Sequence, residues 1–123
     1  MQDHPSAFDV LGQAITYLRD GVAPRSEARE QFELRVTISA LQLVQRTLAQ
    51  QAASDAAEAS RLAALLGEAG DLDTLNRRLA AAIKNGALTL AAPGVAAHLR
   101  ATAMEKLAID QPTYAAYQRA LEG

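Results

Sequence analysis

Cysteine and tryptophan are absent from this 123-residue sequence, and histidine occurs only twice. Without cysteine there can be no disulfide, no thiolate metal site and no thiol catalysis. The two histidines, His4 and His98, lie too far apart in the sequence for the short spacing of a zinc-binding motif. No apolar run approaches the roughly 18 residues that a membrane-spanning helix needs. The sequence therefore predicts no cofactor, no metal site and no membrane segment.

An excess of positive charge is also missing. Twelve Lys and Arg residues face fourteen Asp and Glu residues, giving a formal net charge of -2 at pH 7. Proteins that bind the phosphate backbone of nucleic acids usually carry a basic patch or a basic excess. The first residues, MQDHP, have neither the basic nor the apolar region of a signal peptide. We expect no nucleic-acid partner and a cytoplasmic location.

Alanine and leucine dominate what is present, with 28 and 17 residues. Both favour helix, and no stretch alternates apolar and polar residues in the manner of a strand. The length is that of one domain. The sequence predicts an all-α, single-domain bundle over residues 1–123, with five or six helices and a long central second helix.

Capping residues and helix stops mark the expected helices. The first runs from about Ser6, its N-cap, to Asp20, and Gly21 ends it. The second runs from its cap Ser26 to about Gln51. The others are expected over 54 to 67 or 70; from the cap Asp71, with Leu72, Leu75, Leu79 and Ile83 inward, to Asn85-Gly86; from Pro93 in the first turn to Ile109; and around Tyr114, Tyr117 and Leu121.

The second helix is apolar nearly all round. One side carries Phe32, Val36 and Leu43, and the other carries Leu34, Ile38, Leu41, Val44 and Leu48. Such a helix is covered by neighbouring helices or by a partner subunit. This excess of apolar surface predicts a homodimer.

The same helix offers a candidate ligand site in one narrow sector: Arg35, Ser39, Gln42 and Arg46. Two guanidinium groups with an amide and a hydroxyl could grip a phosphate or carboxylate. The sector could equally be a solvated strip or form ion pairs with another helix. Tyr114 and Tyr117 could line an apolar pocket for the same ligand, or belong to the core with solvated hydroxyls.

His98 forms the other polar group, with Thr102 and Glu105 on the same helix face. Such a trio could do acid–base chemistry, although a solvated helix face is the simpler interpretation. Arg77 and Arg78 are interpreted as a surface pair near a helix C-terminus.

Three stretches of the sequence carry a recognisable pattern. They are QDHP at 2–5; FELRV at 32–36 with AL at 40–41 and VQR at 44–46; and LRAT at 99–102 with KLAID at 106–110, Pro112, Tyr114 and Tyr117. In these stretches the chain resembles a bacterial family of small proteins of unknown function. The family is often encoded beside acyl-CoA dehydrogenases and aminoglycoside-phosphotransferase-like kinases. The chain departs from the family pattern at Ser39, where asparagine is usual, and at Thr47, where glutamate is usual.

The resemblance implies a role near acyl-CoA catabolism and assigns no catalytic residue. We therefore expect a non-enzymatic accessory or interaction protein that works with such a phosphotransferase or dehydrogenase. The alternative is a helical bundle that binds a small molecule or acyl-CoA through Arg35 and Arg46. An enzyme using His98 and Glu105 is the least favoured hypothesis.

Overall fold

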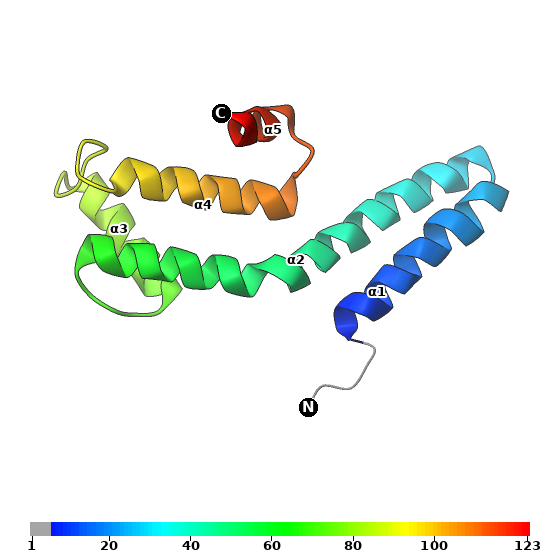
Figure 1. The fold of residues 1–123 in the computed structure, drawn as a ribbon, viewed down its shortest axis with the longest axis horizontal. Helices are drawn as coiled ribbons and strands as arrows, with labels where there is room; N and C mark the ends of the chain where they lie inside the picture. The colour runs from blue at the N-terminus through cyan, green and yellow to red at the C-terminus, as the bar shows by residue number, and fades with distance from the viewer. Residues whose placement is uncertain (1–5) are drawn as a thin grey trace. The chain divides into compact units, whose positions relative to one another are not determined.

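The computed structural model describes residues 6–123, which form five α-helices and no strand (Figure 1). The all-α fold and the long second helix are thus confirmed. The chain divides into two compact units, residues 1–51 and 52–123, and the second helix contributes to both. The single-domain organisation stays a prediction. His4 and the QDHP stretch lie outside the described residues.

The first unit begins with α1, Ala7–Thr16. Ser6 is its N-cap as predicted, because its Oγ accepts a hydrogen bond from the backbone N–H of Asp9 at 3.1 Å. The expected stop at Gly21 is wrong, since the chain continues helically through η1, Tyr17–Val22, and η2, Ala23–Arg25. Gly21 instead makes room for the Tyr17 ring: a Cβ at position 21 would lie 3.1 Å from Tyr17 Cδ1.

The second helix, α2, spans Ala28–Leu66. It begins two residues after Ser26, whose Oγ donates to the carbonyl of Val22 at 2.8 Å. Gln31 Nε2 fixes this turn by donating to the carbonyls of Ala23 and Ser26. The predicted cap at Ser26 is therefore one residue too early, because the N–H of Gln31 donates to the carbonyl of Glu27 at 2.8 Å.

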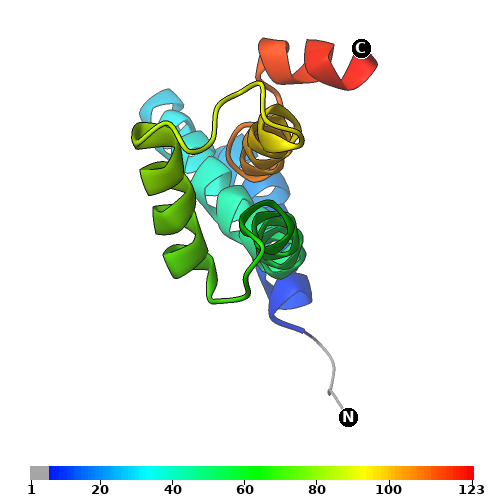
Figure 2. The same ribbon diagram turned by 90° about the vertical axis from the view of Figure 1, so that its left-hand side faces the viewer.

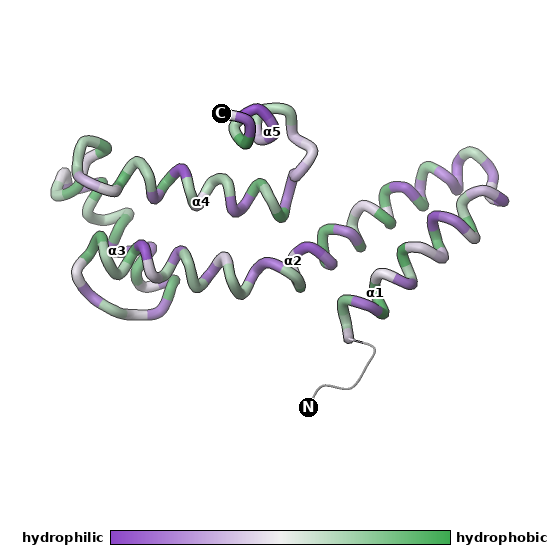
Figure 3. The backbone as a smooth tube through the Cα atoms, in the orientation of Figure 1, coloured by the Kyte–Doolittle hydropathy of each residue, from purple (hydrophilic) through white to green (hydrophobic). Residues whose placement is uncertain are grey.

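Within the first unit, α1 and the first part of α2 run antiparallel (Figure 1). Hydrophobic and hydrophilic residues alternate along both (Figure 3). Ile15 and Ile38 are buried. Gly12 permits a close approach, since a Cβ there would lie 3.0 Å from Gln45 Nε2.

The break expected near residues 51–54 is wrong, because α2 continues to Leu66. Residues 50–59 contain five alanines and neither glycine nor proline. Nothing there interrupts a helix, and Ser54 lies inside it as an ordinary helical residue rather than a cap. The expected second and third helices are one.

The second unit contains the rest of α2, with α3 (Leu72–Lys84), α4 (Val95–Asp110) and α5 (Ala115–Glu122). Figure 2 shows α2, α3 and α4 as neighbouring rods. Leu62, Leu75 and Leu79 form the buried core between α2 and α3.

The predicted start and end of α3 are confirmed, whereas the predictions for Ile83 and Pro93 are wrong. Asp71 caps α3 by accepting from the N–H of Thr74 at 2.9 Å, and α3 ends at Asn85-Gly86. Ile83, expected to face inward, is 41% exposed. Pro93 lies outside α4, whose N-cap is Gly94 at φ +88°. None of the helices described is both long and apolar enough to cross a membrane.

Candidate functional site

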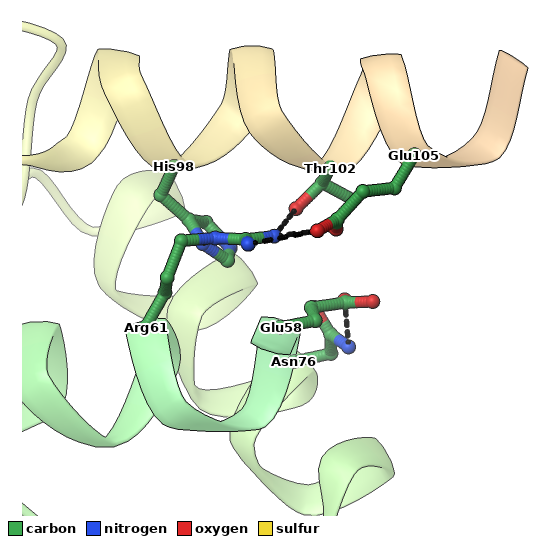
Figure 4. Close-up of polar contacts among 6 residues, drawn as sticks. All are labelled: Glu58, Arg61, Asn76, His98, Thr102 and Glu105. Atoms are coloured by element: carbon green, nitrogen blue, oxygen red, sulfur yellow. Dashed lines mark hydrogen bonds and ion pairs between the residues drawn. The ribbon is translucent and has the colours of Figure 1, made fainter. Parts of the chain in front are cut away.

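Arg61 is the centre of a polar cluster in the second unit (Figure 4). Its Nε donates to His98 Nδ1 at 3.1 Å. Its Nη2 donates to Thr102 Oγ1 at 3.1 Å and to Glu105 Oε1 at 2.8 Å, and its Nη1 donates to Glu105 Oε2 at 3.1 Å. We call Arg61, His98, Thr102 and Glu105 the Arg61 cluster.

Two antiparallel helices supply these side chains. Arg61 projects from α2, and its three partners project from successive turns of one face of α4 (Figure 4). His98 is only 3% exposed, while the side chains of Arg61 and Glu105 are 26% and 27% exposed. The cluster therefore lies at the edge of the helix interface, partly shielded from water.

The proximity of these groups shifts their pKa values. The hydrogen bond from Arg61 lowers the pKa of Glu105, and the bond to Glu105 raises the pKa of Arg61. The pKa of His98 is lowered, first by burial and then by the positive charge of Arg61. Because Nδ1 accepts from Arg61, the proton of neutral His98 is assigned to Nε2.

Glu58 supplies a second polar contact on α2. It is buried, and its Oε2 accepts from Asn76 Nδ2 on α3 at 2.9 Å (Figure 4). Glu58 and Arg61 therefore join α2 to α3 and α4 respectively. Polar bonds at these two positions complement the leucine core of the unit.

The chemistry of the cluster is that of a structural ion pair. Glu105 is engaged through both oxygens, and every guanidinium nitrogen of Arg61 donates. His98 can accept a proton at Nδ1 only by giving up its bond from Arg61. The arrangement therefore holds α4 against α2.

The trio His98, Thr102 and Glu105 is brought together as the sequence indicated, but Arg61 was missed. It lies 37 residues before His98, so no local pattern connects the two. The sequence offered one signal. Arg61 is a single arginine among alanines and leucines, and Glu105 has no basic residue three or four positions away on its own helix.

The predicted sector of α2 lies on one helix face in the first unit, but its members border different hollows. Arg35 lines a hollow of about 260 Å³ with Ala23, Pro24 and Gln31, and its guanidinium lies 5.8 Å from the centre of the Phe32 ring. Gln42 lines a hollow of about 720 Å³ beside α1. Ser39 is exposed, and Arg46 is half-buried and engaged with a partner.

The remaining predicted residues belong to the second unit. Tyr114 is exposed just before α5, and Tyr117 is half-buried on α5. Their part in a ligand site, like that of the Arg35 sector, stays a prediction. Arg77 and Arg78 are exposed on α3 and form ion pairs with Asp73 and Glu68. Over residues 6–123, no group of three or more His, Asp or Glu side chains is placed to hold a metal ion.

The fold and the cluster define an all-helical protein whose buried polar side chains join its helices. Residues 24–114 match the family described as Domain of unknown function (DUF6285), and the chain belongs to that family. This confirms the resemblance to a family of unknown function, while the match says nothing of bacterial origin or neighbouring genes. No curated protein and no solved structure is significantly similar to the chain.

Proposed function

We propose that the chain is a non-catalytic accessory protein that acts by binding another protein. The observation that carries this proposal is one face of α2 in the first unit, formed by Phe32, Val36 and Leu43. These side chains are 60%, 56% and 38% exposed, and their spacing of four and seven places them on one side of the helix. Apolar side chains exposed along one side of a helix offer a surface that a partner protein can cover. We call them the Phe32 face.

The Arg61 cluster supports the non-catalytic part of the proposal. The guanidinium donors of Arg61 and the carboxylate of Glu105 are hydrogen-bonded within the cluster, as in a structural contact. A general base needs a free lone pair within reach of its substrate. The exposed apolar side chains are therefore better candidates for function than the polar ones.

The partner follows from the family resemblance. We propose an acyl-CoA dehydrogenase or an aminoglycoside-phosphotransferase-like kinase, acting in acyl-CoA catabolism in the cytoplasm. The test adds the purified chain to each enzyme of the same genome, with binding measured by calorimetry and turnover measured with and without the chain.

A double variant, Val36→Gln with Leu43→Gln, removes apolar area from the Phe32 face and keeps good helix-forming residues. It should weaken binding at least tenfold. Val10→Gln is the matched control, because Val10 is an exposed apolar residue on α1. The proposal fails if neither enzyme binds the chain and the chain changes the turnover of neither enzyme.

We also propose a homodimer, because α2 leaves apolar side chains exposed on more than one side. Val44 and Leu48 are exposed, and they lie on a different side of α2 from the Phe32 face. Two sides of one helix can be covered by two different chains, and cyclic dimers are the commonest homo-oligomers.

The second candidate function is small-molecule or acyl-CoA binding. It is favoured by the hollow beside α1 that Gln42 lines, whose volume of about 720 Å³ is in the range of ligand sites. Arg35 and Arg46 line the same face of α2 but not this hollow, so they would hold an anionic group that extends beyond it. A thermal-shift screen of CoA esters and sugar phosphates tests it, and a ligand whose effect is unchanged in Arg35→Ala would count against this site.

A further inference from the structure

A hollow of about 650 Å³ runs along the second unit between α2 and the first half of α4. Small residues create it, since it is lined by Ala64 of α2, by Gly94, the N-cap of α4, and by Ala97 and Ala101 of α4. Leu65 and Pro93 add apolar wall. Among the described residues that line it, only Arg61 and His98 have polar side chains. The hollow is therefore mostly apolar, with two neighbouring polar side chains in its wall.

His98 brings an unused donor to this hollow. Its Nδ1 is occupied by Arg61, so Nε2 carries the proton, and no described residue accepts from Nε2. Among the described residues, no fully enclosed polar side-chain atom lacks a hydrogen-bond partner. Nε2 is therefore not fully enclosed, although His98 is only 3% exposed, and His98 lines the hollow.

The surrounding charges decide what kind of acceptor fits. Arg61 is neutralised by Glu105, and the buried Glu58 carboxylate acts on both Arg61 and His98. The single positive charge is thus matched against two negative charges. A carboxylate or phosphate would be repelled, whereas an uncharged carbonyl oxygen would accept from Nε2 without that cost.

We propose that this hollow binds a small uncharged molecule that carries a carbonyl oxygen on a short apolar chain. The carbonyl accepts from His98 Nε2, and the chain lies against Ala64, Ala97 and Ala101. This site is separate from the Phe32 face, so its failure leaves the accessory function untouched.

The test titrates the full chain with 2-hexanone and, in parallel, with hexanoate, while nuclear magnetic resonance follows the His98 Nε2 proton and the backbone amides of α4. For a ligand of this size we expect a Kd on the order of 1 mM for 2-hexanone. The His98 Nε2 proton should shift together with the amides of Ala97 and Ala101. Hexanoate should bind at least tenfold more weakly.

Ala97→Leu fills the hollow with a helix-forming side chain and should weaken 2-hexanone binding at least tenfold. Ala96→Leu is the matched control, because Ala96 is the neighbouring exposed residue and does not line the hollow. Ala64→Leu fills the hollow from α2 and replaces Ala97→Leu as the test variant if Ala97→Leu does not fold. The proposal is overturned if 2-hexanone shifts no α4 resonance at tens of times the expected Kd, if hexanoate binds equally well, or if the filled variants bind as the wild type does.

Discussion

Arg61 Nε lies 3.1 Å from Nδ1 of His98, a side chain that is almost fully buried. This contact does two things at once. It holds α4 against α2, and it fixes the His98 proton on Nε2. The stability of the second unit, its pH dependence and the proposed ligand site all depend on this pair.

Replacing Arg61 should be costly, because its partners lose their donor in a partly shielded place. Arg61→Met keeps much of the apolar stem and removes the charge. We expect the free energy of unfolding to fall by about 2–4 kcal/mol, as when one partner is removed from other ion pairs that are shielded from water. Arg77→Met removes a fully exposed ion pair with Asp73 and should cost at most about 1 kcal/mol. Urea denaturation of both variants measures the difference, and equal losses would contradict a structural role for the Arg61 cluster.

Protonation of His98 should destabilise the fold. The folded pKa lies below the ordinary value of 6.5, so the unfolded chain takes up the proton first as the pH falls. The free energy of unfolding should therefore be highest above about pH 6.5 and decrease below it, by at most about 1.4 kcal/mol per pH unit. The charged groups that face His98 are Arg61 and Glu58 on α2 and Glu105 on its own helix.

His98→Asn separates this effect from others, because its amide oxygen can accept from Arg61 but does not titrate. The variant should lose the dependence between about pH 7 and 5. The loss at lower pH should remain, because the lowered pKa of Glu105 contributes stability that disappears as the pH falls below the ordinary carboxyl range. An unchanged profile in His98→Asn would exclude His98 as the titrating group.

Gly94 is constrained both by its backbone conformation and by a close neighbour, whereas Gly86 is constrained by its backbone conformation alone. Both have positive φ, +88° and +82°, but a Cβ at position 94 would lie 3.0 Å from Leu65 Cδ2, whereas position 86 is open. Gly86→Ala should cost about 1–2 kcal/mol for the backbone conformation alone. Gly94→Ala should cost about 1–3 kcal/mol more for the overpacking. Thermal unfolding of the two variants compares them, and equal destabilisation would show that Leu65 moves aside freely.

The proposed homodimer gives a prediction about mass. Multi-angle light scattering at micromolar concentration should report twice the chain mass of 13.0 kDa. Val44→Gln with Leu48→Gln should shift that mass toward the monomer, while Leu90→Gln, an exposed apolar residue of the second unit, should not. A monomeric wild type would contradict the dimer.

Much of the fold could be predicted because its signals are local. The caps Ser6 and Asp71 bond to N–H groups three residues later, so the sequence contains both partners. The single long α2 was mistaken for two helices because Ser54 resembles a cap, although the surrounding alanines continue the helix. Ile83 has a helical apolar spacing, but whether that spacing is buried depends on the neighbouring helices.

The candidate site could be predicted only in part, for a related reason. The spacing of His98, Thr102 and Glu105 places them on one face of a helix whatever surrounds it. Their partner Arg61 depends on how α4 packs against α2, which no periodicity within α4 specifies. The Arg35 sector shows the converse: residues that share a helix face need not share a pocket.

Protein binding through the Phe32 face is the central claim, and amide hydrogen exchange tests it most directly. Exchange over residues 32–43 of α2 would be measured in the chain alone and with each candidate enzyme at saturation. The account predicts slower exchange there in the complex with one of the enzymes, and no slowing in the Val36→Gln, Leu43→Gln variant. Unchanged exchange over residues 32–43 while a complex is present would contradict it.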